Sequence, residues 1–112
     1  MAKKICDTIS IDGVLYKTES VPTETIKSLD DLIGRSLLIR TVTYFMLGRV
    51  DAIVDGFMVL STASWVADTG RFMQAIQNGT LNEVEPVGIA YVQIASIVDM
   101  FPWVHSLHTA QK

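Results

Sequence analysis

The chain has 112 residues, with 12 acidic and 9 Lys or Arg side chains and a formal net charge of -3 at pH 7. This is the length of a single domain, which buries about two thirds of the surface that the unfolded chain exposes. We therefore expect one domain, 1–112, that folds without a metal or a disulfide. Hydrophobic residues make up 49% of it, more than its core requires, so part of them should lie at a subunit interface. The negative charge opposes phosphate backbones, and a nucleic-acid site would need a local basic patch.

Cysteine use and hydropathy restrict the location of the protein. Cys6 is the single cysteine, which excludes an internal disulfide and is compatible with a reducing cytoplasm. No segment approaches the roughly 20 apolar residues of a transmembrane helix. We expect a soluble, cytoplasmic protein without membrane contacts.

The N-terminal region has the pattern of a β-hairpin. Two β-prone runs, 5–11 and 14–18, flank Asp12-Gly13. An Asp-Gly pair is typical of a two-residue hairpin turn, in which both central residues take positive φ. The polar residues that follow, 19–25, form a connector, so the hairpin and its connector should occupy 1–26.

A short helix is predicted over 29–33. Ser28 and Asp31 have the capping-box spacing, and Gly34 ends the helix. Its inward side chains should be Leu29, Leu32 and Ile33.

The central region predicts long strands. Runs 37–43 and 44–54 are followed by Asp55-Gly56, a second hairpin turn signal, and by the strand 57–66. Gly48 interrupts the second run, and a glycine inside a strand permits a sharp bend, so we expect one strongly curved strand. Its apolar face should consist of Tyr44, Met46, Val50, Ala52 and Val54.

A second helix should span 69–78, with Asp68 or Thr69 as its N-cap and Asn78-Gly79 as its end. Beyond it, 87–100 is apolar except at Gln93, Ser96 and Asp99. A strand pair there would be buried on nearly every side, and such runs often pair across subunits.

Side chains capable of chemistry give no enzyme pattern. His105 and His108 have a spacing that could bind a metal, but no carboxylate or thiolate lies near them in sequence, so we assign them to a mobile tail, 101–112. Asp30 and Asp31 suit the start of a helix better than acid-base catalysis. We therefore expect no catalytic residue, metal site or cofactor.

Arginines and aromatic residues alternate along the chain and allow two interpretations. They could form a surface that pairs with phosphate and stacks on bases. Alternatively, the aromatic residues are core and the arginines lie along sheet edges, which the composition favours. The residues concerned are Arg35, Arg40, Arg49 and Arg71 with Tyr44, Phe45, Phe57 and Trp65.

Taken as a series, segments 29–35, 36–41 and 47–53 resemble the first Sm motif of Sm and LSm proteins, in which a helix leads into three strands, the second bent at a glycine. Segment 91–98 resembles the second Sm motif, above all that of the bacterial host-factor (Hfq) branch. The resemblance implies a mainly all-β fold, a strongly bent five-stranded antiparallel sheet or small open barrel with a short N-terminal helix. This core would span 27–100, with 69–78 as an inserted helix and the hairpin as an N-terminal addition.

The resemblance also implies a homo-oligomeric ring that binds single-stranded RNA or DNA. Small Sm-like proteins of marine phage type are the nearest subgroup, which would place the protein in the host cell cytoplasm. Val54 and Met58 stand where the family carries an aspartate and an asparagine, and Ile94-Ala95 or Ala95-Ser96 replaces arginine-glycine, so the family's uridine-type pocket is not intact.

The expected contacts come from two loops, with two arginines as phosphate partners: Asp55, Gly56, Phe57, Gln93, Ala95 and Ser96, with Arg40 and Arg49. The alternative is a structural assembly subunit of a phage particle or protein complex that binds no nucleic acid.

Overall fold

A computed structural model of the protein describes residues 8–11, 14–17 and 26–112, the first two ranges as backbone only. Strands β1 (Thr8–Ile11) and β2 (Val14–Lys17) pair in an antiparallel, two-stranded sheet. The predicted N-terminal hairpin is therefore confirmed. Its expected turn at Asp12-Gly13, the connector 19–25 and Cys6 lie outside the described residues.

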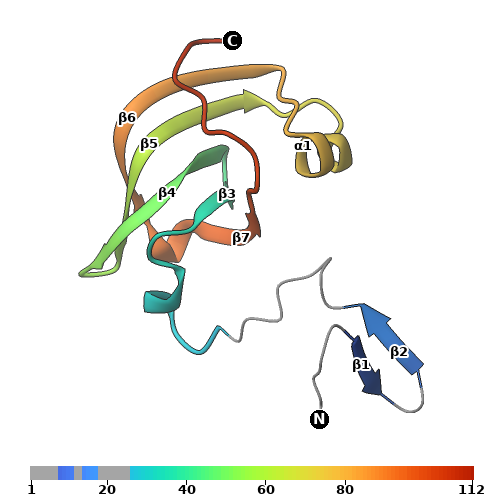
Figure 1. The fold of residues 1–112 in the computed structure, drawn as a ribbon. Coiled ribbons are helices and arrows are strands. Elements are labelled where there is room, and N and C mark those ends of the chain that lie inside the picture. The colour runs from blue at the N-terminus through green and yellow to red at the C-terminus, as the bar shows by residue number, and fades with distance from the viewer. Residues whose placement is uncertain (1–7, 12–13, 18–25) are drawn as a thin grey trace.

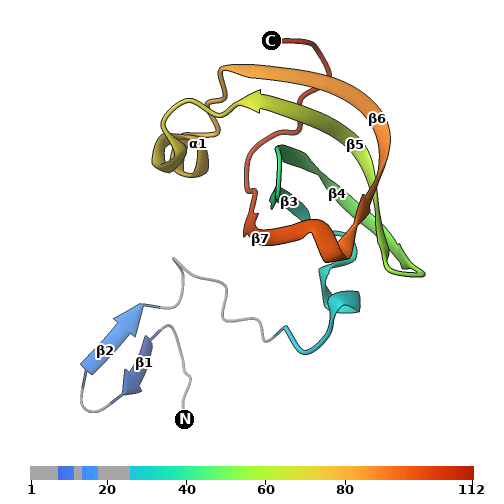
Figure 2. The same cartoon turned by 180° about the vertical axis from the view of Figure 1, so that it is seen from behind.

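The remaining strands form one five-stranded antiparallel sheet in the order β6-β5-β4-β3-β7. The strands are β3 (Ser36–Thr41), β4 (Phe45–Val54), β5 (Phe57–Asp68), β6 (Glu83–Gln93) and β7 (Ile97–Pro102). The first four form a meander, and the chain then returns so that β7 pairs with β3. Figures 1 and 2 show how strongly β5 and β6 curve. The predicted fold class, a bent five-stranded antiparallel sheet, is confirmed.

Gly48 lies where β4 packs tightly against β5. A Cβ atom at this position would lie 3.1 Å from the Cβ of Leu60 and 3.3 Å from the Cα of Ala63. Pairing with β5 shifts register at Gly48, between Leu47 and Arg49, and again beyond it, between Val50 and Ala52. Such bulges bend a strand and increase its twist, so the predicted bend is confirmed.

The same shifts change which side chains of this strand face inward. Ile53 packs against the core, whereas Val54 is 51% exposed and Tyr44 is also exposed. The predicted apolar face is therefore wrong at both ends, because Val54 lies beyond the two register shifts and Tyr44 lies before β4 begins.

A single 3-10 turn, η1 (Leu29–Leu32), precedes β3. The Asp31 carboxylate accepts hydrogen bonds from the backbone N–H groups of Lys27 at 2.7 Å and Ser28 at 3.3 Å, as a capping residue should. Leu32 is buried, but Leu29 and Ile33 are exposed. The prediction that all three face inward is wrong, because so short a helix presents only one residue to the sheet.

The inserted helix, α1 (Phe72–Asn78), lies between β5 and β6 as predicted but begins later. Strand β5 continues to Asp68, whose carboxylate accepts a hydrogen bond from the Gly70 N–H at 2.9 Å and so forms a turn instead of a helix cap. The predicted cap at Asp68 or Thr69 is wrong, since Arg71 occupies the N-cap position. Gly79 ends the helix with φ 74°, as expected.

The sheet has a hydrophobic core on each of its two faces. One core consists of Leu32, Leu37, Ile39, Met46, Val50, Met58, Leu60, Ala63 and Val92. The other contains residues from the sheet, α1 and the C-terminal segment: Leu38, Leu47, Val66, Ala75, Leu81, Val84 and Trp103. Neighbours on β3 thus belong to opposite cores, which explains why its three apolar residues, Leu37, Leu38 and Ile39, are consecutive.

The C-terminal segment packs against the sheet, contrary to the predicted mobile tail. Trp103 is 4% exposed, and its backbone N–H donates to the Ser36 carbonyl at 2.9 Å. This burial depends on partners far away in sequence, which no local periodicity signals.

Apolar side chains of β6 and β7 remain exposed in the protomer. Val87, Ile89 and Tyr91 of β6 are 52%, 63% and 70% exposed, and Val98 of β7 is 54% exposed. Burial on nearly every side is therefore wrong for the single chain, and the exposed residues lie on the two outermost strands of the sheet.

Candidate nucleic-acid interface

Six of the eight predicted contact residues come together in what we call the loop cluster. It consists of the β4–β5 turn, Asp55 and Gly56, the 3-10 turn η2 (Ile94–Ser96), and the flanking Phe57 and Gln93. The Ile94 N–H donates to the Gly56 carbonyl at 2.9 Å, and Phe57 pairs with Gln93 across β5 and β6. The two loops, some 40 residues apart in sequence, thus form one surface.

Local geometry explains the shape of each loop. Asp55 and Gly56 have φ 49° and 83°, as the predicted two-residue turn requires. In η2, the Ser96 hydroxyl donates to the Gln93 carbonyl at 2.7 Å. The Ser96 carbonyl accepts a hydrogen bond from the Val42 N–H at 3.1 Å, which connects the loop cluster to the β3–β4 turn.

A hollow of about 570 Å³ lies beside the loop cluster, lined by Val54, Asp55, Phe57, Val59 and Tyr91. Phe57 is 42% exposed and Tyr91 is 70% exposed. Flat aromatic faces at a surface can stack on bases whatever their sequence. Neither Arg40 nor Arg49 lines this hollow, so its walls provide aromatic and aliphatic contacts and one carboxylate.

Sequence reasoning did not single out three of these lining residues, Val54, Val59 and Tyr91, as contacts. Val59 stands opposite Tyr91 in the β5–β6 register, and that pairing creates the hollow. Tyr91 is recognisable in the sequence as the start of the second motif, but its neighbours depend on how β5 pairs with β6, which a short window of sequence does not reveal.

Arg40 is held by a carboxylate. Its Nε and Nη2 donate to the two carboxylate oxygens of Asp99 at 2.9 and 2.6 Å, the forked geometry that arginine and aspartate prefer. The two residues are register partners on β3 and β7. The hydrogen bond from Arg40 lowers the pKa of Asp99 below its usual range, and the same contact raises the pKa of Arg40. A phosphate would have to displace this carboxylate.

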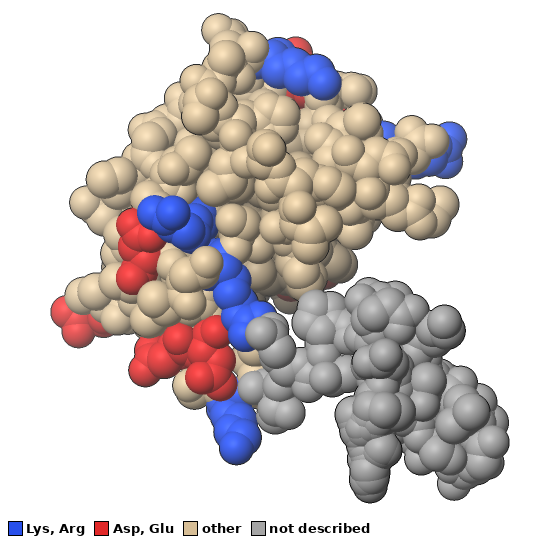
Figure 3. All heavy atoms as spheres, viewed as in Figure 1, with Lys and Arg blue, Asp and Glu red and all other residues tan. Residues whose placement is uncertain are grey.

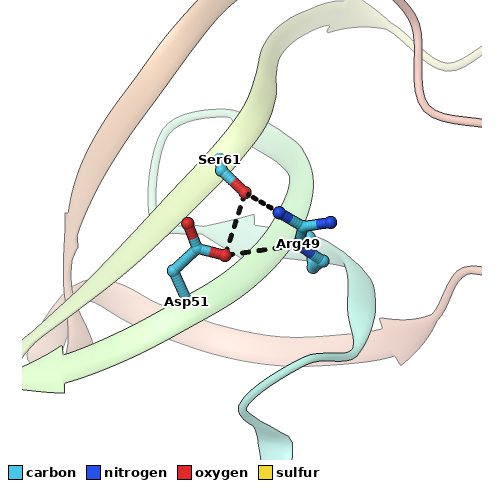
Figure 4. A network of polar contacts seen from close by, with 3 residues as sticks. All are labelled: Arg49, Asp51 and Ser61. Atoms are coloured by element: carbon cyan, nitrogen blue, oxygen red, sulfur yellow. Dashed lines mark hydrogen bonds and ion pairs between the residues drawn. The ribbon is translucent and has the colours of Figure 1, made fainter.

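Arg49 belongs to a three-residue polar network (Figure 4). Its Nε donates to Asp51 at 3.3 Å and its Nη2 donates to the Ser61 hydroxyl at 3.0 Å. The Ser61 hydroxyl in turn donates to Asp51 at 2.9 Å. Both predicted phosphate partners are therefore engaged within the protomer, and neither is brought to the loop cluster.

Charged side chains are sparse on the face shown in Figure 3, where most of the surface is uncharged and acidic atoms gather beside basic ones at one end. Mixed charges of this kind do not make the continuous basic patch that phosphate backbones require. Arg40 and Arg49 pair with carboxylates but lie on the inner strands β3 and β4, so the expected placement along sheet edges is wrong for these two. The aromatic residues are divided, since Phe45 packs against a core and Tyr44, Phe57 and Trp65 are exposed.

Metal binding and membrane-spanning helices concern the part of the chain that the structure describes. There, no group of three or more His, Cys, Asp or Glu side chains is placed to hold a metal ion. His105 instead contacts the Ile76 carbonyl through Nε2 at 2.8 Å. Within the same residues, no helix is long and apolar enough to cross a membrane.

The strand order, the bend at Gly48 and the short helix ahead of β3 together define an Sm-like fold. The fold that the sequence resemblance implied is thus confirmed. The Hfq-like and phage-type assignments stay predictions.

Comparison with known proteins finds similar structures but no family. The chain matches no family model and no curated protein. Among solved structures, it is similar to a heptameric archaeal Sm protein, with 18% identity, a TM-score of 0.46 and coverage of 66% of this chain and 93% of that one. The P. aerophilum SmAP1 heptamer gives the same identity and TM-score, with coverage of 66% and 85%. A chain of the NatC complex bound to CoA reaches a TM-score of 0.50 at 15% identity, with coverage of 70% and 88%. At such identity the likeness concerns the fold alone.

Proposed function

We propose that this protein is a ring-forming Sm-like module that binds single-stranded RNA at the loop cluster, chiefly by stacking bases on Phe57 and Tyr91. The observation that carries this proposal is the meeting of the two loops beside an aromatic hollow. Ring formation follows from the two sheet edges, β6 and β7, which carry exposed apolar side chains and unpaired backbone along much of their length. Closure of copies edge to edge would remove both edges.

This mode of binding differs from one based on phosphate contacts. Because Arg40 and Arg49 are held by carboxylates, few counterions are released on binding, so affinity should fall only slightly as salt rises. Stacking should supply most of the free energy, at about 1–3 kcal/mol per base.

The test is filter binding of oligo-U and oligo-A to the wild type and to Phe57→Ala, Tyr91→Ala and Met73→Ala. We expect each aromatic substitution to weaken binding by about 5- to 100-fold, the equivalent of one lost stacked base. Met73 is 61% exposed on α1 and serves as a control for loss of apolar surface, so its substitution should change nothing. Undetectable binding by the wild type at low salt would refute RNA binding.

The second candidate is an assembly subunit that binds no nucleic acid. The engagement of both predicted phosphate partners by carboxylates favours it. Under this alternative Phe57→Ala, like Arg49→Glu, leaves function unchanged, and a partner protein is recovered with the ring. Light scattering tests what the two candidates share, because a monodisperse monomer contradicts both.

A further inference from the structure

The free edge of β6 has two halves of different character. Its first half contains Glu83, Glu85 and Pro86. Charged residues and a proline, which has no N–H to donate, discourage another strand from pairing. The second half, 87–93, has no charged residue and carries the three exposed apolar side chains already described.

A second feature protects the first half. We call residues 103–112 the strap. At its far end the Val84 N–H donates to the Lys112 carbonyl at 3.0 Å, and the Lys112 N–H donates to the Val84 carbonyl at 2.9 Å. Such an exchange of two hydrogen bonds between two residues is that of an antiparallel strand pair. Val84 faces Val66 of β5 on its other side, so Lys112 occupies the outer edge of the sheet.

The strap is anchored along its course from β7 to β6 (Figures 1 and 2). Trp103 is buried, and its indole N–H donates to the Ser106 carbonyl at 3.2 Å. The His105 ring stacks edge-on against Trp103 at 5.0 Å and lies so close to Gly79 that a Cβ atom there would be 2.6 Å from its Cγ. Leu107 packs against the second core. These earlier contacts of the strap position Lys112 beside Val84.

We propose that the strap is an edge guard that restricts association through β6 to residues 87–93. The inference rests on the proposed ring and adds how its register is set. The occupant of the open segment is β7 of a second copy, an outermost strand of six residues with an exposed Val98. A partner strand that slid toward Glu85 would meet the backbone pair at Val84, so sliding is blocked in that direction. Without the guard, more than one register is open and copies join in more than one way.

The test compares two double variants of the full chain. Gln111→Pro with Lys112→Pro removes the backbone donor that reaches Val84, whereas Gln111→Ala with Lys112→Ala removes the same side chains and keeps the backbone pair. Hydrogen exchange at the Val84 amide reports whether the strap is released. Native mass spectrometry and light scattering report the assembly, and circular dichroism checks folding.

We expect the proline variant to exchange the Val84 amide roughly tenfold faster, as loss of the pairing requires, and to give a broader mass distribution with larger species. The alanine variant should behave like the wild type. Faster exchange with an unchanged mass distribution would overturn the proposal. So would an unchanged exchange rate, because the strap would then not be what covers this backbone. A monomeric wild type would instead refute the ring. In that case the edge guard would be supported if the proline variant associates more than the wild type, and overturned if it does not.

Discussion

Replacement of Gly48 by alanine tests whether the bend of β4 depends on close backbone approach. The added methyl group would lie 3.1 Å from the Leu60 Cβ, 3.3 Å from the Ala63 Cα and 3.3 Å from the Ser61 carbonyl oxygen. Two of these three atoms are backbone, so side-chain rotation cannot make room. Overpacking of a core by one such group costs about 1–3 kcal/mol, and we expect Gly48→Ala to lower the free energy of unfolding by about that amount.

Urea denaturation at a fixed protomer concentration measures this loss, since association would otherwise change the apparent stability. With a slope of about 1–3 kcal/mol per M urea, the midpoint should fall by about 1 M. Gly56 gives a matched control, because a Cβ there meets nothing within 4 Å and only its φ of +83° disfavours a side chain.

Asparagine tolerates positive φ better than alanine, so the order of the two substitutions should reverse between the sites. Gly56→Asn should be milder than Gly56→Ala, whereas Gly48→Asn, the larger side chain, should be worse than Gly48→Ala. A Gly48→Ala protein within about 0.5 kcal/mol of the wild type would show that the close approach does not restrict this position.

Three further outcomes follow from single groups. Ser64→Ala should raise the free energy of unfolding by about 1 kcal/mol in urea titration, because the buried Ser64 hydroxyl has no hydrogen-bond partner among the described residues; a loss of stability would contradict this. The lowered pKa of Asp99 means that its pairing stabilises the fold above the ordinary value of 3.8 and that this stabilisation is lost as pH falls through the lower folded value. NMR titration should show that lowered pKa, and Arg40→Gln should return it toward 3.8. Burial, with a smaller effect of Lys112, lowers the pKa of His108 below 6.5. The melting temperature should therefore drop as pH falls from 7.5 toward 5.5, and His108→Gln should reduce that drop. An equal drop in the variant and the wild type would contradict this.

Local chemistry determines the parts of this fold that the sequence predicts. Asp55-Gly56 forms its turn because both residues adopt positive φ, and Gly79 ends α1 for the same reason. Gly48 marks the bend because a Cβ atom there would lie within 3.3 Å of three atoms of β5. These features depend on a residue and its near neighbours, and their signals are present in a short window of sequence.

Features that depend on distant partners were not predictable in this way. The fork between Arg40 and Asp99 joins residues 59 positions apart, and the pairing of Val84 with Lys112 depends on how the whole strap packs. The candidate site shows both cases. Its loops could be located from turn residues, while the aromatic hollow beside them depends on the pairing of Val59 with Tyr91.

The pairing of β3 with β7 has a consequence for synthesis of the protein. Strands β3 to β6 can join one after another as the chain leaves the ribosome, since each pairs with its predecessor. The second side of β3 has to wait until Pro102 has emerged, because Leu37 pairs with that residue. Until then β3, with its apolar run from Leu37 to Ile39, has one unpaired side, and nascent chains can associate there incorrectly. A translation pause or early stop before this point would thus release a product that is more prone to aggregate than its length suggests.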